Sequence, residues 1–153
     1  MGLHVSLDEA VVRSFMLNAT ILLVKMLLMS TFTSMNRLAK GIFANKEDAR
    51  YFASKDAGKV KLDDVDIERI RRSHLNDLEN IPAFLFMGAL YVVTLPDPRL
   101  ASILFSAYTL CRVGHSLVYA VWPQPQPARF IFYAGGFAIT LYMASQVAIH
   151  AIL

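Results

Sequence analysis

Polar side chains that could bind a small ligand recur on three apolar segments of the sequence. In a helix, at about 100° per residue, Arg72, Asn76 and Glu79 fall within one narrow stripe. The same count gives two later segments a polar face each: Arg112, His115, Ser116 and Tyr119 on one, and Arg129, Tyr133, Gly136 and Thr140 on the other. Arginines, amide and phenol groups and one carboxylate together suit a small, net-anionic ligand that also carries an amine.

Four apolar blocks, at 15–35, 81–95, 100–122 and 130–153, must position these side chains. They lack the alternation of barrel strands, so they indicate helices, and a helix needs ~20 apolar residues to span a bilayer. The block 81–95 is too short alone, so its helix must begin near Arg72 and carry polar groups to membrane depth. Polar groups at that depth are costly and indicate a functional site by default.

We therefore predict a single membrane domain over the whole chain. Its fold class is an all-α integral membrane protein, a bundle of four transmembrane helices. The expected helices cover about 10–37, 72–95, 100–121 and 128–151, and the expected long loop covers about 38–71.

Composition narrows the possible functions. The chain has 153 residues, of which 56% are hydrophobic, and its net charge is only +3. This is more apolar than a typical soluble domain, and it argues against a strongly basic nucleic-acid-binding protein. Cys111 is the only cysteine, which excludes an intrachain disulfide and a CxxC metal or redox pair. We predict no metal site, and the residues 1–14 do not resemble a removable signal peptide.

The basic residues predict an orientation in the membrane. Cytosolic loops carry an excess of Lys and Arg. The segment 36–73 holds ten of the fifteen basic residues: Arg37, Lys40, Lys46, Arg50, Lys55, Lys59, Lys61, Arg69, Arg71 and Arg72. We expect this loop to face the cytosol, with both termini on the opposite side. The proline-rich turn 122–129 then lies on the cytosolic side, as do the polar stripes.

Structural roles explain part of the same pattern. Buried polar side chains also hold membrane helices together, and for a single residue this role is as good an explanation as ligand binding. Three stripes at one depth on three helices favour a site. Lys25 stands alone on the first helix, and we predict an ion pair between it and Asp77 or another buried acid. Arg37 either anchors a lipid headgroup or reaches the site.

Several motifs resemble a known family. The stretches "ATILLVKMLLMSTFTSMNRLAKGIFANKEDA", "IERIRRSHLNDLENI", "LPDP" and "PQPAR" are similar to the membrane-associated proteins in eicosanoid and glutathione metabolism. Within that family they are most similar to the microsomal glutathione transferase branch of the first type. The resemblance implies a homotrimer in the endoplasmic reticulum membrane, with sites between neighbouring subunits that open to the cytosol. It leaves the mitochondrial outer membrane open as a second location.

The resemblance also implies a ligand and the residues that bind it. Glutathione would be the co-substrate, and its anionic, amine-bearing chemistry fits the polar stripes. The residues that would bind it are Arg72, His74, Asn76 and Glu79 on the second helix, Arg112, His115 and Tyr119 on the third, Arg129 and Tyr133 on the fourth, and Arg37 of the adjacent subunit. The second substrate would be an apolar electrophile or a lipid hydroperoxide that arrives from the bilayer.

Thiol chemistry suggests the catalytic residues. The thiolate is the nucleophile, and a free thiol has a pKa of about 8.5. We expect Arg129 to face the sulfur and stabilise the thiolate, with Tyr133 as a second donor. The expected activity is that of a glutathione transferase with glutathione peroxidase activity.

Three positions depart from the family pattern. Ala49 stands where mammalian relatives carry a cysteine, so activation through that thiol should be absent. Pro82 lies one residue earlier than in the relatives, which predicts a bend at a slightly different point of the second helix. Phe130 follows Arg129 where the prostaglandin E synthase branch has a serine, and this argues against prostaglandin synthesis.

Two other functions stay open on the sequence. One is a prostaglandin E synthase-like isomerase that uses glutathione as a cofactor. The other is a non-catalytic membrane scaffold of the same family, in which the polar stripes serve only assembly. The scaffold predicts no glutathione-dependent turnover, and it predicts that loss of Arg129 lowers stability rather than activity.

Overall fold

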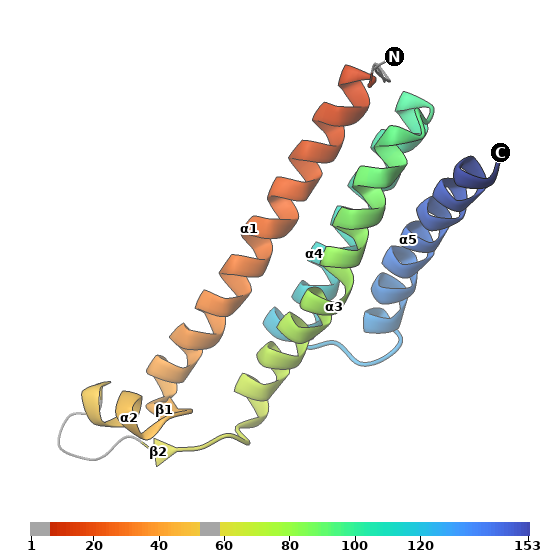
Figure 1. The fold of residues 1–153 in the computed structure, drawn as a ribbon. Coiled ribbons are helices and arrows are strands. Elements are labelled where there is room, and N and C mark those ends of the chain that lie inside the picture. The colour runs from red at the N-terminus through yellow and green to blue at the C-terminus, as the bar shows by residue number, and fades with distance from the viewer. Residues whose placement is uncertain (1–6, 53–58) are drawn as a thin grey trace.

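Long helices dominate the computed structural model, which describes residues 7–52 and 59–153 (Figure 1). They are α1 (Glu9–Lys40), α3 (Val65–Val93), α4 (Pro98–Ser116) and α5 (Ala128–Ile152), and α4 continues into the π-helix η1 (Leu117–Val121). The short elements between α1 and α3 are β1 (Ile42–Phe43), α2 (Lys46–Phe52) and β2 (Lys59–Val60). The signal-peptide interpretation concerns residues 1–14, of which 1–6 lie outside the described residues, as does Lys55 of the basic loop.

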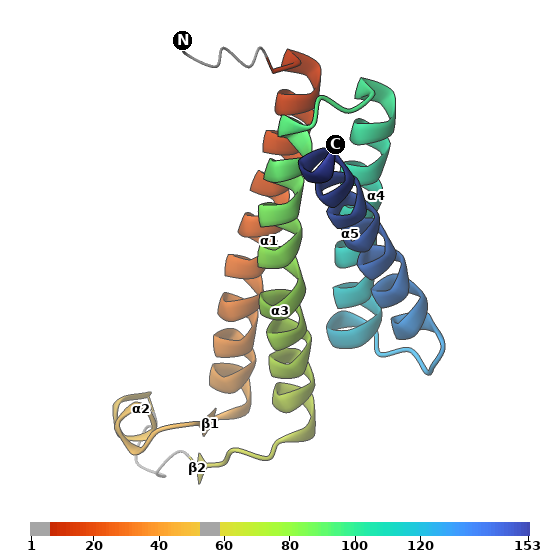
Figure 2. The ribbon, with the colours of Figure 1, turned by 45° about the vertical axis from the view of Figure 1, so that its right-hand side comes forward.

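The connections between the long helices lie at two ends of the molecule. The start of α1, the turn between α3 and α4, and the C-terminus lie at one end (Figures 1 and 2). The short elements and the connection between α4 and α5 lie toward the other end. This arrangement brings the basic segment and the proline-rich turn toward the same end of the helix bundle.

Local signals explain where α1 begins and ends and where α3 begins. Asp8 caps α1, since its carboxylate accepts from the backbone N–H of Ala10 at 2.8 Å. Gly41 ends α1 with φ 62°, a left-handed conformation that glycine adopts without steric cost. Asp64 caps α3 in the same way as Asp8 caps α1. Helix α3 therefore begins at Val65, earlier than the start near Arg72 that spanning length alone suggested.

The short elements form a small sheet beside the end of α1. Strands β1 and β2 pair in parallel, with Ile42 opposite Lys59 and Phe43 opposite Val60. The composition of this segment predicts only a loop here. Two residues per strand are too few to show an alternating pattern, so sequence periodicity could not reveal them.

Aromatic side chains build the core between α1, α3 and α4. The rings of Phe84 and Tyr108 stack with centroids 3.7 Å apart, and Phe105 packs edge-on against Phe84 and Phe15. Leu22 of α1 is completely buried against this cluster. Large apolar side chains nevertheless remain exposed along α1 and α5, as expected for helices that face lipid or neighbouring subunits.

Among the described residues, two helices, α1 and α5, are long and apolar enough to cross a membrane. Only 17% and 11% of their most apolar stretches are buried, whereas the core helix of a soluble protein is mostly buried. Helix α3 continues through Pro82, and its first half is charged. The fold is therefore an all-α arrangement, apart from the small sheet, with outward-facing apolar helices.

Candidate functional site

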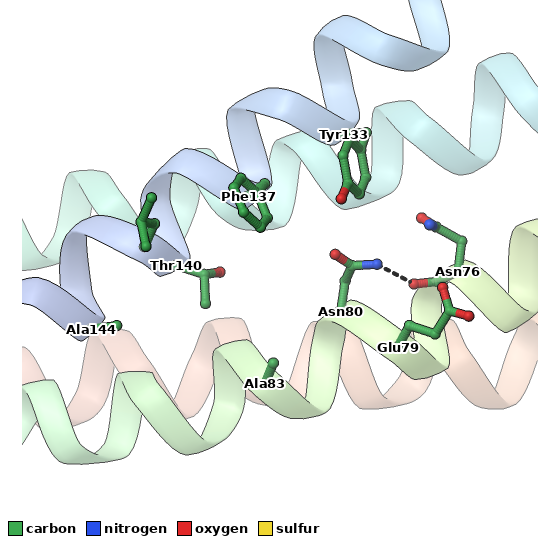
Figure 3. Close-up of a pocket in the computed structure, with 9 residues that line it drawn as sticks. Asn76, Glu79, Asn80, Ala83, Tyr133, Phe137, Thr140 and Ala144 are labelled. Carbon is green, nitrogen blue, oxygen red and sulfur yellow. Dashed lines mark hydrogen bonds between the residues drawn. The ribbon is translucent and has the colours of Figure 1, made fainter.

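A pocket of about 500 Å³ lies between α3 and α5. Its lining consists of Asn76, Glu79, Asn80, Ala83, Tyr133, Phe137, Thr140, Leu141 and Ala144. Figure 3 shows the polar side chains of α3 and Tyr133 at one end, and Ala83 and Ala144 toward the other. The pocket thus joins a polar end to a mainly apolar end, where the hydroxyl of Thr140 donates to the backbone carbonyl of Gly136 at 3.2 Å.

Helical spacing places the lining residues of α3 on one face of that helix and those of α5 on one face of the other. Each helix therefore forms one wall of the pocket. Asn76, Glu79, Asn80 and Ala83 recur at intervals of three and four residues, the spacing of neighbours on a helix face. Tyr133 and Phe137 are four residues apart on α5, and their rings stack with centroids 6.0 Å apart. The structure therefore brings together Asn76, Glu79 and Tyr133, three of the side chains that the sequence predicted for the site.

Hydrogen bonds hold the α3 wall in place. The side-chain amide of Asn80 donates to the backbone carbonyl of Asn76 at 2.7 Å (Figure 3). The hydroxyl of Tyr108 donates to the backbone carbonyl of Asn80 at 2.9 Å. Glu79 makes no hydrogen bond or ion pair among the described residues and stays exposed, so its carboxylate is free to bind an incoming cation.

Behind the pocket lies a buried cluster of charges centred on Asp77. The Asp77 side chain is completely buried, and its carboxylate accepts from Lys25 Nζ at 2.5 Å and from Arg112 Nη2 at 2.9 Å. Ser116 donates to the same carboxylate at 3.3 Å. The predicted ion pair between Lys25 and Asp77 is confirmed. It links α1 and α3, and Arg112 extends the cluster to α4.

Arg112 connects this cluster to the pocket wall. Its Nη2 donates both to Asp77 Oδ1 and to Asn76 Oδ1, the second at 2.7 Å. The Arg112 side chain is only 1% exposed. Arg112 therefore lies beneath the pocket wall in this chain, whereas the family resemblance implied a direct contact with the ligand.

A second group of predicted residues gathers where η1 meets α5. The guanidinium carbon of Arg129 lies 4.6 Å from the ring centroid of Tyr119, a cation–π contact. The ring of His115 packs edge-on against Tyr119, with centroids 5.5 Å apart. Tyr119 belongs to η1, and such π-helical turns are frequent at functional sites. Arg129 Nε and His115 Nδ1 are buried without a hydrogen-bond partner among residues 7–52 and 59–153.

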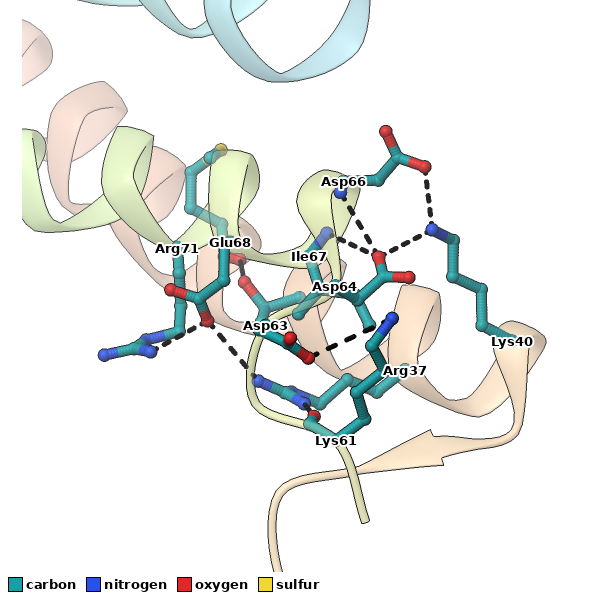
Figure 4. A network of polar contacts seen from close by, with 11 residues as sticks. Arg37, Lys40, Lys61, Asp63, Asp64, Asp66, Ile67, Glu68 and Arg71 are labelled. Carbon is teal, nitrogen blue, oxygen red and sulfur yellow. Dashed lines mark hydrogen bonds and ion pairs between the residues drawn. The ribbon is translucent and has the colours of Figure 1, made fainter. Parts of the chain in front are cut away.

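Arg37 belongs to a separate polar network at the end of α1. Its Nη1 donates to the backbone carbonyl of Lys61 at 3.5 Å, and its Nη2 lies 4.0 Å from Glu68 Oε1 (Figure 4). Within this chain Arg37 does not line the pocket. Of the remaining predicted residues, Arg72 is exposed and His74 is partly buried, and neither lines the pocket.

Lys40, at the C-terminal end of α1, forms ion pairs with residues at the start of α3. Its ammonium lies 2.7 Å from both Asp64 Oδ1 and Asp66 Oδ2 (Figure 4). Hydrogen bonding to Lys40 lowers the pKa of the Asp64 and Asp66 carboxyls below their ordinary values. These contacts position the polar half of α3 relative to α1.

Asn80, Phe137 and the pairing of Arg112 were not predicted as parts of the site. Asn80 lies four residues after Asn76, so continuing the predicted stripe by one turn would have found it. Phe137 could not be singled out from the sequence, because it is one apolar residue among many in its segment. Within the described parts of the chain, no three His, Cys, Asp or Glu side chains are grouped to hold a metal ion.

Two long, outward-facing apolar helices beside a buried charge cluster and a half-polar pocket are typical of an α-helical membrane protein. The family model described as MAPEG family matches residues 15–149, and the chain belongs to this family. It is 43% identical to human microsomal glutathione S-transferase 1 over 142 residues, which cover 92% of this chain and 91% of that one. The rat protein of the same name is 41% identical over the same length. Prostaglandin E synthase of the horse is 39% identical over 106 residues, covering 69% of this chain and 67% of that one.

Proposed function

We propose that the protein is a glutathione transferase that conjugates glutathione to apolar electrophiles and also reduces lipid hydroperoxides. The observation that carries this proposal is the pocket between α3 and α5, because it joins a free carboxylate, amide groups and a phenol to an apolar end. A polar tripeptide and an apolar second substrate need such a combination. The 43% identity to human microsomal glutathione S-transferase 1 over nearly the whole chain supports the same activity.

The polar end of the pocket suits glutathione. Glutathione carries one amine, two carboxylates and a thiol. In the proposal Glu79 binds the amine, and Tyr133 lies toward the thiol. The further ligands proposed are Arg72, His74, Asn76, His115, Tyr119 and Arg129, together with Arg37 of a neighbouring subunit, and Arg112 supports Asn76 from behind the pocket wall.

Arg129 carries the activation step in this mechanism. A guanidinium near the sulfur favours the thiolate over the thiol, and each unit by which the pKa of the thiol falls corresponds to about 1.4 kcal/mol. The thiol proton passes to solvent. The thiolate then forms a bond to the electrophilic carbon, and the leaving group departs with its electron pair. With a hydroperoxide, two glutathione molecules are oxidised to the disulfide while the hydroperoxide is reduced to an alcohol and water.

The apolar end of the pocket would receive the second substrate. Ala83, Phe137 and Ala144 offer no hydrogen-bonding side chain, so they select by shape and hydrophobicity. A lipid hydroperoxide or an apolar electrophile dissolved in the bilayer would enter between α3 and α5. The proposed location is the endoplasmic reticulum membrane, with four transmembrane helices and the site facing the cytosol.

A homotrimer completes the proposal. Large apolar side chains of α1 and α5 are exposed in the single chain, and so is Glu79, which lines the pocket. Packing of subunits would cover this side and would bring a second chain's Arg37 toward the pocket.

A glutathione-dependent prostaglandin E synthase is the second candidate, favoured by the 39% identity to the horse enzyme. That similarity covers a shorter part of the chain than the similarity to the transferases. Supplying purified protein with glutathione and a prostaglandin endoperoxide, and identifying the product by mass spectrometry, separates the two. An isomerised product in the absence of conjugates would favour this second candidate.

The proposed transferase activity is tested with purified, detergent-solubilised protein, glutathione and an activated aryl halide. Wild type should form the thioether conjugate, and Arg129→Ala should lower kcat/KM by at least about 100-fold, the usual cost of losing a charge-stabilising donor. Arg13→Ala, an exposed arginine paired with Glu9 on α1, is the matched control and should keep wild-type rates. Normal turnover by Arg129→Ala would refute the assignment, and no conjugate from wild type would favour the scaffold.

A further inference from the structure

The contact between Arg112 and Asn76 determines whether the oxygen or the nitrogen of the Asn76 side-chain amide is available in the pocket. Asn76 Oδ1 accepts from Arg112 Nη2 at 2.7 Å. A guanidinium only donates, so it can pair with the oxygen of the Asn76 amide but not with its nitrogen. The amide NH₂ of Asn76, which lines the pocket, is thereby left as the group available to a ligand.

The buried cluster holds Arg112 in the position that this requires. Arg112 Nη2 has two hydrogens, and the structure pairs one with Asp77 and the other with Asn76. Asp77 in turn is bound by Lys25 from α1 at 2.5 Å. The Asp77 and Arg112 side chains are 0% and 1% exposed, so neither reaches the pocket itself. Arg112 therefore acts on the pocket through Asn76.

We infer that Arg112 is a positioning residue that orients Asn76 as a hydrogen-bond donor toward the carboxylate or carbonyl oxygen of a ligand. This inference rests on the proposed function for the identity of the ligand, which is glutathione. Asn76 then binds an acidic or carbonyl oxygen of the tripeptide, whereas the neighbouring Glu79 binds its amine. This indirect role differs from the direct contact between Arg112 and the ligand that the family resemblance implied.

The first test changes the polarity of the amide without removing its bond to Arg112. Asn76→Asp keeps an oxygen for Arg112 but replaces the NH₂ group by a second acceptor. Its dissociation constant for glutathione, measured by calorimetry, should rise about 10- to 100-fold, as expected when a hydrogen bond to a charged group is lost. Unchanged or tighter binding would show that position 76 offers an acceptor, and would overturn the inference.

The second test asks whether Arg112 acts through Asn76. Arg112→Met leaves Asp77 paired with Lys25, and it should raise the dissociation constant for glutathione about 10-fold, as should Asn76→Ala. In the double variant the two effects should not multiply, because both remove the same donor from the pocket. A direct or purely structural contribution of Arg112 would instead multiply with that of Asn76 to about 100-fold, and would overturn the inference.

The kinetic readout and the controls separate positioning from stability. At saturating glutathione the kcat of Arg112→Met should stay within about threefold of wild type while KM rises. Ser102→Ala removes a 3.1 Å hydrogen bond between α1 and α4 and serves as the matched control, with unchanged KM. If wild type itself binds no glutathione, the proposed function fails along with this inference. If wild type binds and Asn76→Asp binds equally well, only the inference fails.

Discussion

Asp77 balances the charge of the residues behind the pocket. Two cations, Lys25 and Arg112, share this one carboxylate, which is fully buried. A buried charge without a partner is far more costly than a paired one. Removing the charge of Asp77 leaves both cations buried without a counter-charge. Removing either cation leaves Asp77 paired with the other one. We therefore expect the loss of Asp77 to cost more stability than the loss of one cation.

This asymmetry predicts which of two variants loses more free energy of unfolding. Asp77→Asn leaves two buried cations without a counter-charge and should lower the free energy of unfolding by about 3–5 kcal/mol. Lys25→Met leaves Asp77 paired with Arg112 and should cost clearly less. Thermal unfolding in one detergent, with both variants side by side, measures the order. A larger loss for Lys25→Met would show that Lys25 makes a contribution beyond its pairing with Asp77.

Glu79 should contribute to binding through charge rather than through stability. Glu79→Gln keeps the size of this exposed side chain but removes the charge that would pair with the amine of glutathione. Its dissociation constant for glutathione should rise about 10-fold, with unchanged thermal stability. Glutathione lacking its amino group is the matched ligand: wild type and Glu79→Gln should bind it equally. A preserved difference with that ligand would mean that Glu79 contacts another part of the tripeptide.

At the scale of elements, glycine lets α4 and α5 approach closely. A Cβ atom on Gly114 would lie 2.4 Å from Cε1 of Phe132, and one on Gly135 would lie 2.9 Å from Sγ of Cys111. Small residues at such contacts allow membrane helices to pack tightly. This packing positions Arg129 and Tyr133 of α5 against the residues of α4 and η1.

Gly114→Ala should separate the two helices. The added methyl group overlaps the ring of Phe132, so the free energy of unfolding should fall by about 1–3 kcal/mol. Glutathione turnover should fall too, because Arg129 would shift. Adding Phe132→Leu makes room, so the double variant should be more stable than the sum of the two single effects predicts. Simple additivity would show that the two residues do not meet.

The contacts of Lys40 predict a pH dependence at the junction of α1 and α3. The pKa values of Asp64 and Asp66 are lowered in the folded protein, so their stabilising contribution is present above the unfolded value, about 3.9, and is lost as the pH falls through the folded values. The Tm of Lys40→Gln should therefore lie below that of wild type near neutral pH, and the difference should shrink below about pH 4. Lys61→Gln, whose ammonium lies 3.9 Å from the exposed Asp63, is the control and should show no such trend. A Tm difference independent of pH would contradict the role of Lys40.

Helix positions within one segment could be predicted better than relations between segments. Spacing placed Asn76 and Glu79 on one face, and burial cost alone predicted a partner for Lys25, which Asp77 provides. Periodicity says nothing about how one helix is rotated against another. For this reason the burial of Arg112 under the wall could not be predicted. The early start of α3 was missed because the expected boundary relied on apolar length, whereas the cap at Asp64 decides it.

At the scale of the whole molecule, the charged and apolar regions are separated. Ion pairs gather at the end that holds α2 and the two strands, and exposed apolar side chains run along α1 and α5. The pocket between α3 and α5 has polar groups at one end and apolar ones at the other (Figure 3). A water-soluble thiol and a membrane-dissolved electrophile could therefore meet in it, which is the central claim of the proposed function.

The ultraviolet difference spectrum of bound glutathione at neutral pH tests this claim most directly. Free glutathione is mostly thiol there, since a free thiol has a pKa of about 8.5. Purified protein should show a thiolate band on binding glutathione, and Arg129→Ala should lose that band while Arg13→Ala keeps it. A wild-type protein that binds glutathione as the thiol, or an Arg129→Ala variant with an undiminished thiolate band, would contradict the proposed activation.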